Sequence, residues 1–220
     1  MNFTAPFNIG IAGPSCAGKT SLARRLAELL PGRTTIFGLD SYYHDLSHLP
    51  FAERKKFNFD HPEALEDEML AAHLQQLSCG EPIQRPVYHF PTHTRAADKF
   101  EEVQAGDFLI VEGLFTFYWP QVRGIFHLRV FVHAPDWVCF DRRKVRDIEE
   151  RGRTMDFILA QYNETVRPGS ESFILPTQQF AHLVISGEQP IEESAQQIYE
   201  LVQTKQASGF LPQRAPRTQR

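Results

Sequence analysis

The chain has 220 residues, of which 42% are hydrophobic, and its formal net charge is −4. This length and composition are typical of one α/β domain with a substantial core, and the slight acidity provides no basic field for nucleic acid or an anionic membrane. Three cysteines without a CxxC pair argue against a disulfide framework and favour a reducing cytoplasm. The N-terminus lacks a basic segment followed by an apolar one, so we expect no secretion signal, and no apolar run reaches the ~18 residues of a membrane span.

Strands and helices alternate along the chain. Apolar stretches predict strands at 7–12, 34–39, 107–112, 128–133 and 183–186. Helical spacing of apolar residues predicts helices at 19–30, 62–78, 136–150, 155–166 and 191–206. This alternation is typical of βαβ units, so we expect an α/β fold with a mostly parallel sheet flanked by helices.

Two segments depart from that alternation. Residues 83–90 are rich in β-branched and aromatic side chains and contain two prolines, so we expect a hairpin that projects from the sheet. From residue 207 onward the chain contains Pro212, Pro216 and three arginines but no acid. This composition indicates a frayed, solvated tail, with a functional basic arm as the less favoured alternative.

A phosphate-binding loop follows the first predicted strand. It consists of Gly13, Pro14, Ser15, Cys16, Ala17, Gly18, Lys19 and Thr20, which match the pattern G-x-x-x-x-G-K-[ST]. A helix follows, with leucines at helical spacing. Such a strand–loop–helix directs successive backbone N–H groups and the positive end of the helix dipole at one point, which suits a triphosphate. Lys19 is expected to neutralise the β- and γ-phosphates, and the Thr20 hydroxyl to hold Mg²⁺.

Carboxylates stand at the ends of two other predicted strands. Asp40 follows the strand at 34–39, and Glu112 ends the strand at 107–112. Ligands of parallel sheets bind beyond the carboxyl ends of the strands, so both carboxylates should lie on the side of the P-loop. An aspartate at a strand end is by itself more often a helix cap. Beside a P-loop, however, the pair suits a kinase, which needs carboxylates to hold Mg²⁺ and to accept the proton of an attacking hydroxyl.

The segment 142–153 carries six basic side chains. As a helix it would have an apolar stripe of Val138, Val145 and Ile148, with arginines on a different side. Because acids are interspersed, the segment alone indicates a solvated face with ion pairs. Beside a P-loop, the arginines also suit a lid that neutralises charge on a transferred phosphoryl group.

Several segments, in order, resemble the uridine kinase family of P-loop nucleoside kinases. They are GPSCAGKT at 13–20, LDSYY at 39–43, NFDHP at 58–62, PVYHFPTH at 86–93 with Arg95, IVEGL at 110–114, RDIEERGR at 146–153 and FILP at 173–176. The resemblance covers residues 7–187, and NFDHP together with RDIEERGR is its most specific part. It implies a P-loop NTPase-type sheet with a β-hairpin insert and an arginine-rich helical lid. The activity that it implies is phosphorylation of the 5′-hydroxyl of uridine or cytidine by ATP (or GTP) with Mg²⁺.

The resemblance also implies roles for three carboxylates. Asp40 matches the residue that receives the 5′-hydroxyl proton and helps to hold Mg²⁺, and Glu112 matches the second acidic residue of the Mg²⁺ site. Asp60 matches the carboxylate that binds the ribose 2′- and 3′-hydroxyls, a task that suits a group accepting on both oxygens. Capping of the helix that Pro62 opens is an alternative role for Asp60, and both could hold together.

The remaining matched residues surround the nucleoside and the phosphates. The residues that match the nucleoside pocket are Tyr43, Phe59, Tyr88, Phe90 and His93. Flat rings stack on a pyrimidine, and an imidazole can hydrogen-bond its O4 or N4 edge. A core cluster is the competing interpretation, although the neighbouring prolines make this a poor place for a core. The resemblance gives the lid residues Arg146 and Arg153 catalytic roles, Arg143 and Arg151 nucleotide contacts, Arg146 also a substrate contact, and Gln161 a place at the adenine or lid end.

Two positions depart from the family pattern. His89 stands where the family usually has an aspartate, and Cys139 lies where it commonly has an arginine. His89 and His93 are four residues apart, but Pro91 between them is incompatible with a helix and no third ligand is apparent, so a metal pair is not favoured.

We therefore predict one kinase domain over residues 1–206, with a hairpin insert at 83–95, a lid at 142–166 and a tail at 207–220. The expected partner is a small-molecule nucleoside, with no nucleic acid and no membrane, and the resemblance implies a homo-oligomer, tetramer or dimer. One alternative is a related P-loop kinase acting on another ribosyl or pantothenate-like acceptor. The other is a nucleotide switch without turnover, which would not need Asp40, Asp60 and an aromatic pocket together.

Overall fold

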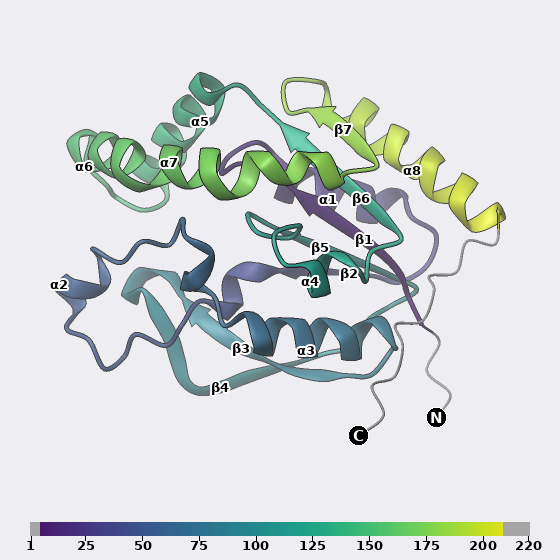
Figure 1. Cartoon of the computed structure of the whole chain (residues 1–220), viewed down its shortest axis with the longest axis horizontal. Helices are drawn as coiled ribbons and strands as arrows, with labels where there is room; N and C mark the ends of the chain where they lie inside the picture. Colours follow the sequence, from purple (N-terminus) through teal and green to yellow (C-terminus); the bar gives the residue numbers. More distant parts are fainter. Residues whose placement is uncertain (1–4, 209–220) are drawn as a thin grey trace.

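A computed structural model describes residues 5–208. The strands are β1 (Phe7–Ala12), β2 (Thr34–Gly38), β3 (Ile83–His89), β4 (Thr94–Val103), β5 (Phe108–Gly113), β6 (Leu128–His133) and β7 (Leu183–Ser186). The helices are α1 (Lys19–Leu29), α2 (Phe51–Arg54), α3 (Asp67–Ser78), α4 (Pro120–Arg123), α5 (Asp136–Glu149), α6 (Met155–Gln161), α7 (Arg167–Gly169) and α8 (Ile191–Ala207). Five strands form a parallel sheet in the order β2-β5-β1-β6-β7, with β1 at its centre (Figure 1).

The predicted α/β fold class is confirmed, and all five predicted strands are present with ends within one residue. Two helices differ from their predictions. The segment 62–78 begins as the 3₁₀ turn Pro62–Ala64 and becomes α3 only at Asp67. The segment 155–166 begins as α6 and ends in the π-helical turn Tyr162–Val166. The chain then stays helical through α7, a second π-helical turn at Ser170–Ile174 and the 3₁₀ helix Leu175–Phe180. This continuation beyond residue 166 was not predicted.

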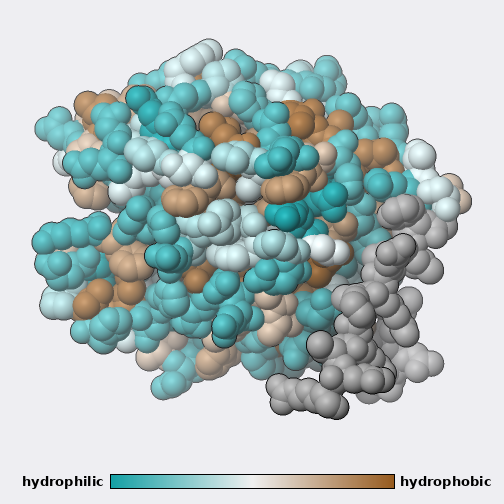
Figure 2. Space-filling model, in the orientation of Figure 1, coloured by the Kyte–Doolittle hydropathy of each residue, from teal (hydrophilic) through white to brown (hydrophobic). Residues whose placement is uncertain are grey.

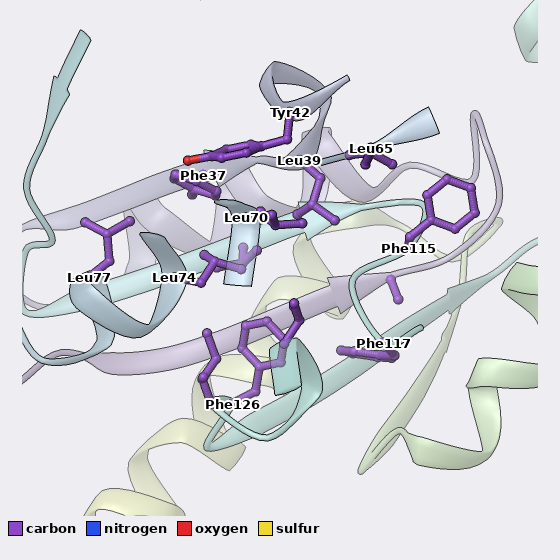
Figure 3. Close-up of a cluster of buried hydrophobic side chains, with 14 of the residues drawn as sticks. Phe37, Leu39, Tyr42, Leu65, Leu70, Leu74, Leu77, Phe115, Phe117 and Phe126 are labelled. Atoms are coloured by element: carbon purple, nitrogen blue, oxygen red, sulfur yellow. The ribbon is translucent and has the colours of Figure 1, made fainter. Parts of the chain in front are cut away.

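The sheet is covered on both faces by apolar clusters. On one face Ile9 and Ile11 of β1 pack with residues of α1 and α8. On the other face, leucines of α3 meet Phe37, Phe115 and Phe117, as Figure 3 shows. Near-continuous burial is what a central parallel strand requires, and it holds the loop after β1 on a rigid support.

The hairpin β3–β4 forms a separate antiparallel sheet and lies with α2 and α3 on the lower side of the molecule in Figure 1. It extends further than the predicted insert at 83–95, because β4 continues to Val103. Most of β4 is exposed, and its sequence TRAADKFEEV is rich in charge. A strand that pairs on one side only and faces solvent needs no apolar alternation, so hydrophobic patterning does not reveal this strand.

Helix α5 buries only the first residue of the predicted stripe. Val138 is buried, but Val145 and Ile148 are 51% and 47% exposed. The buried residues in the second half of the helix are instead Arg143 and Asp147, so the stripe prediction was wrong there. These two side chains can be buried because their opposite charges lie 3.5 Å apart.

Two further predictions concern the C-terminal end of the chain and membrane-spanning helices. Helix α8 continues to Ala207, one residue past the predicted end at 206, and the tail from 209 to 220 lies outside the described residues. No helix between residues 5 and 208 is both long and apolar enough to cross a bilayer.

Candidate active site

All predicted site residues except Gly13 and Pro14 line one cleft of about 1270 Å³. Its walls come from the P-loop, the turn after β2, the hairpin, the lid around α5 and α6, and the segment between β7 and α8. Helices α5 to α7 lie above it in Figure 1 and the hairpin with α2 lies below, and Figure 2 shows the surface notched between these two parts. This is the edge of the sheet at which parallel strands present their carboxyl ends to a ligand.

Gly13 and Pro14 do not line the cleft, but they hold the P-loop in its conformation. Gly13 has a φ of +148°, and a Cβ there would lie 2.2 Å from the carbonyl oxygen of Val132, so only glycine fits. The Pro14 carbonyl accepts a hydrogen bond of 2.8 Å from Lys19 Nζ. Burial lowers the pKa of Lys19, while two nearby carboxylates act in the opposite direction. The ammonium group is therefore held inside the loop, where a triphosphate would bind.

The predicted Mg²⁺ ligands lie together at one corner of the cleft. Thr20 Oγ1 donates a hydrogen bond of 3.0 Å to Glu112 Oε1. Asp40 lies in the 3₁₀ turn Leu39–Tyr42 after β2 and is accessible through the cleft. Desolvation by the surrounding protein raises the pKa of Asp40 to about 6, and the charge of Glu112 adds to this rise while Lys19 opposes it. A cation bound between the two carboxylates would relieve their repulsion.

The donor atoms of this corner fit Mg²⁺. Two carboxylates and a hydroxyl are hard oxygen ligands, and Mg²⁺ usually combines one or two protein carboxylates with water and substrate phosphates. Residues 5–208 contain no group of three or more His, Cys, Asp and Glu side chains that could hold a metal ion, and this corner provides only two carboxylates beside the Thr20 hydroxyl. His89 bonds to the Thr92 hydroxyl at 2.8 Å, and His93 stacks on Phe59.

The aromatic residues form the opposite wall. The Tyr43 ring lies 5.1 Å from Phe59 and 5.5 Å from Tyr88 between centroids, and His93 stacks on Phe59 at 5.6 Å. Phe90 packs edge-on against Tyr88 and is 50% exposed. The Tyr88 hydroxyl is buried and has no hydrogen-bond partner within the protein. Tyr43 also belongs to the apolar cluster under the sheet, and Phe59 and Tyr88 pack against that cluster, so the wall is continuous with the core on one side and lines the cleft on the other.

Asp60 lies between this wall and the lid. It is only 6% exposed, and its Oδ2 accepts a hydrogen bond of 3.2 Å from the Thr165 hydroxyl. Burial raises the pKa of Asp60, and the charge of Arg143 opposes the rise. The helix cap is instead His61, whose Nδ1 accepts from the Glu63 N–H at 3.3 Å, so the predicted capping role of Asp60 was wrong. Because Asp60 does not cap the helix and lines the cleft, its carboxylate can accept further hydrogen bonds from a ligand there.

The lid arginines converge above the P-loop. Arg143 donates to the Ser15 hydroxyl at 3.2 Å and to Gln161 Oε1 at 2.9 Å. Arg153 donates to the same Gln161 oxygen at 3.0 Å. Gln161 was predicted to lie at the adenine end or at the lid. In the structure it lies in the lid, where its side-chain oxygen accepts hydrogen bonds from Arg143 and Arg153.

Sequence reasoning missed the residue at the centre of this array, Asp147. Its side chain is completely buried and lies within 4 Å of four guanidinium groups, those of Arg143, Arg146, Arg151 and Arg153. Burial alone would raise the pKa of Asp147, but the surrounding arginines outweigh it and the pKa is lowered. The signal was present in the sequence, because Asp147 lies four residues from Arg143 and from Arg151.

The segment after β7 was also missed. Ser186, Gly187 and Gln189 line the cleft, and the Gly187 carbonyl accepts a hydrogen bond of 2.8 Å from Arg142. Arg142 also approaches the Ala17 carbonyl of the P-loop at 3.4 Å. The available signal was the position of β7, whose carboxyl end had to lie at the same edge of the sheet.

The two departures from the family pattern lie outside the cleft. His89 is exposed, because it points away from its neighbour Tyr88 along strand β3. Cys139 is buried beneath α5, and burial raises the pKa of its thiol to about 11. Cys16, in contrast, lines the cleft within the P-loop with a φ of +63°.

Comparisons with known proteins agree with this architecture. The sequence profile of the phosphoribulokinase / uridine kinase family matches residues 8–190. The chain belongs to this family. It is 41% identical over 190 residues to the uridine kinase of Shewanella frigidimarina, covering 84% of this chain and 89% of that protein. It is also 42% identical over 181 residues to the uridine kinase of Deinococcus deserti, covering 82% and 87%.

Solved structures of more distant proteins share the fold. D-glycerate 3-kinase from Cryptococcus neoformans superposes with a TM-score of 0.61 at 15% identity, covering 84% of this chain and 88% of that one. Phosphoribulokinase from Rhodobacter spheroides superposes with a TM-score of 0.58 at 14% identity, covering 85% and 74%. At such low identity the likeness shows the fold alone.

Proposed function

We propose that the protein transfers the γ-phosphoryl group of ATP to the 5′-hydroxyl of uridine or cytidine, giving ADP and UMP or CMP. The observation that carries the proposal is the position of Asp40 in the cleft. Its charge acts on Lys19 of the P-loop and also on Tyr43 and Tyr88 of the aromatic wall. Identity of about 40% to proteins named uridine kinase supports a nucleoside as the acceptor.

In this reaction the chain aligns two substrates and neutralises charge. Asp40 accepts the proton of the 5′-hydroxyl, and a pKa raised to about 6 makes its carboxylate a better base than an ordinary aspartate. Lys19 and the N–H groups of the P-loop bind the β- and γ-phosphates, and the lid arginines stabilise charge on the transferred group. No covalent enzyme intermediate is needed, because alignment supplies much of the rate enhancement.

Mg²⁺ would be held by Thr20, Asp40 and Glu112, and when bound it would neutralise charge on the phosphates. The base of the nucleotide donor would lie near Gly187, where the segment after β7 lines the cleft. ATP and GTP remain the two candidate donors.

Selectivity for the acceptor follows from the opposite wall. Asp60 accepts hydrogen bonds from the 2′- and 3′-hydroxyls, so a ribose is preferred to a deoxyribose. His93 presents an N–H to O4 of uracil or a bare nitrogen to N4 of cytosine by changing tautomer. Tyr88 and Phe90 wall the pocket, and we expect this wall to exclude the larger purine bases. We therefore expect uridine and cytidine to be accepted with similar efficiency, and adenosine and guanosine to be rejected.

The test is ADP release by the purified protein with MgATP and a panel of nucleosides, pantothenate and other small alcohols. Turnover with uridine and cytidine within about tenfold of each other would support the proposal, because tautomer exchange costs little at a neutral imidazole. Good activity on another acceptor, with none on either pyrimidine, would instead favour a related small-molecule kinase. Binding of MgATP without turnover on any acceptor would indicate a nucleotide switch.

A cytoplasmic location and a homo-oligomer, dimer or tetramer, complete the proposal. Cellular fractionation tests the location. Light scattering during size-exclusion chromatography measures the number of chains in the assembly.

A further inference from the structure

We infer that Asp147 is a positioning residue, which assembles the four lid arginines into an array competent for phosphoryl transfer. The inference rests on the proposed phosphotransferase function. It gives a role to a residue that does not line the cleft and therefore acts through the arginines. Asp147 lies on the inner face of α5, and its side chain is 0% exposed.

Each oxygen of the carboxylate has its own set of partners. Oδ1 accepts from Arg146 Nε at 3.0 Å and Arg146 Nη2 at 2.8 Å, and it lies 3.4 Å from Arg151 Nη1. Oδ2 accepts from Arg153 Nη1 at 2.9 Å and lies 3.5 Å from Arg143 Nε. The backbone carbonyl of Asp147 accepts from the N–H of Arg153 at 3.0 Å. Arginines from α5 and from the loop after it are thus fixed to a single residue.

The array faces the P-loop directly. Arg143 contacts the Ser15 hydroxyl at 3.2 Å, and Arg146, Arg151 and Arg153 all line the cleft. Arg146 uses Nε and Nη2 on Asp147, which leaves Nη1 for an anion, because a guanidinium has five donors in a fixed fork. The bonds to Asp147 therefore hold the arginines without consuming the donors that phosphates need.

Charge explains why an acid is required at this position. Four guanidinium groups repel one another, and in a partly buried cleft this repulsion is stronger than in water. One carboxylate among them lowers the cost of bringing them together, yet leaves three net positive charges to meet the phosphates. An amide of the same shape could preserve some hydrogen bonds but not the charge.

The test compares Asp147→Asn and Asp147→Ala with the control Asp136→Asn on the same helix. Asp136 accepts from the Tyr162 hydroxyl at 2.7 Å and pairs with Arg167 at 3.1 Å, and it does not line the cleft. We expect Asp147→Asn to lower kcat by about 30-fold, less than the ~100-fold typical for removal of a donor to the transition state, because the arginines remain. KM for the nucleoside should stay within about threefold, since Asp147 itself does not line the cleft and Asn keeps an oxygen that can accept from Arg146. The control should keep the wild-type kcat.

Chemical rescue separates positioning from a merely structural role. Asp147→Ala leaves a cavity of carboxylate size, so added formate should restore kcat at least about fivefold, whereas neutral formamide of the same shape should not, because it brings no charge. A wild-type kcat in Asp147→Asn would overturn the inference. So would a folded Asp147→Ala enzyme that formate fails to rescue or that formamide rescues equally well. If Asp147→Ala does not fold, the Asp147→Asn variant alone tests the inference: a lower kcat with a nearly unchanged KM supports it, and an unchanged kcat overturns it.

Failure of the proposed function is distinguishable from failure of this inference. If the wild-type protein phosphorylates another acceptor, that acceptor replaces uridine in the same comparison. The kcat ratio of Asp147→Asn to Asp136→Asn then tests Asp147 without reference to a pyrimidine.

Discussion

The two walls of the cleft differ in how their polar groups are satisfied. On the phosphate side most polar groups bind one another: Lys19 bonds to the Pro14 carbonyl, Thr20 bonds to Glu112, and the arginines surround a buried carboxylate. Arg143 Nε is buried there without a hydrogen bond, but it lies 3.5 Å from that carboxylate. On the acceptor side aromatic rings dominate. There the buried hydroxyl of Tyr88 lacks a partner within the protein.

This difference assigns different kinetic roles to the two walls. Groups that are already ordered cost little reorganisation when charge develops on a phosphoryl group, so the phosphate side serves the transition state. Polar groups that are satisfied only by a matching ligand penalise every other ligand, so the acceptor side serves selectivity. Changes on the phosphate side should therefore lower kcat, and changes on the acceptor side should raise KM for the nucleoside.

The largest effect is expected at Asp40, where the two walls meet. Asp40→Asn preserves the shape of the side chain but removes the base, so kcat should fall by at least ~100-fold while both substrates still bind. Steady-state kinetics with uridine and isothermal titration with MgATP measure the two quantities. Asp45→Asn is the matched control, because the Asp45 carboxylate bonds to Ser47 and Thr94 and does not line the cleft, and this variant should retain most of kcat. Near-normal turnover of Asp40→Asn would contradict the role of Asp40 as the base.

On the acceptor side, substitution of Asp60 is the most direct test of the predicted effect on KM. Hydrogen bonds to a charged group contribute about 1.5–3 kcal/mol, so Asp60→Ala should raise KM for uridine by ~10- to 100-fold with a much smaller change in KM for MgATP. For the wild-type protein, 2′-deoxyuridine should be a poorer substrate than uridine. Equal efficiency with uridine and 2′-deoxyuridine would show that Asp60 does not bind the ribose, and the separation of the two walls would then fail.

A pH profile sharpens the comparison without a mutation. The pKa of Asp40 is raised to about 6, so its carboxylate is ionised and active above this pH and protonated below it. The value of kcat/KM for MgATP, which reports the enzyme before Mg²⁺ binds, should be flat well above pH 6 and should approach a tenfold fall per pH unit well below it. Circular dichroism over the same range checks that the protein stays folded. A profile that is flat down to pH 5 would exclude Asp40 as the titrating base.

The contrast between the walls also explains what could be predicted from the sequence. The phosphate side was largely predictable, because a P-loop has fixed spacing and a parallel sheet brings Asp40 and Glu112 to the same edge. The acceptor residues came from resemblance to a family, since no periodicity distinguishes Tyr88 in a pocket from Tyr88 in a core. Their roles stay predictions until the kinetic tests are made.

The elements that escaped prediction share a physical cause. Strand β4 is largely polar, and so are Arg143 and Asp147, the buried residues in the second half of α5. A search for apolar periodicity does not detect polar side chains that are buried against specific partners. Asp147 was hidden in a charged segment that also suits a solvated helix. Only the three-dimensional arrangement shows that its carboxylate is enclosed by arginines.

The smallest expected effect concerns Thr165, which lies in the π-helical turn Tyr162–Val166 beside Asp60. Its hydroxyl has two acceptors, Asp60 Oδ2 at 3.2 Å and the Gln161 carbonyl at 3.1 Å, and it has a single proton to donate. If the proton goes to Asp60, it holds that carboxylate in place for the ribose, and Thr165→Val should raise KM for uridine about threefold without lowering kcat. Thr165→Ser keeps the hydroxyl and should behave as the wild type. If both variants match the wild type, the proton belongs to the Gln161 carbonyl, and Asp60 is held by the fold alone.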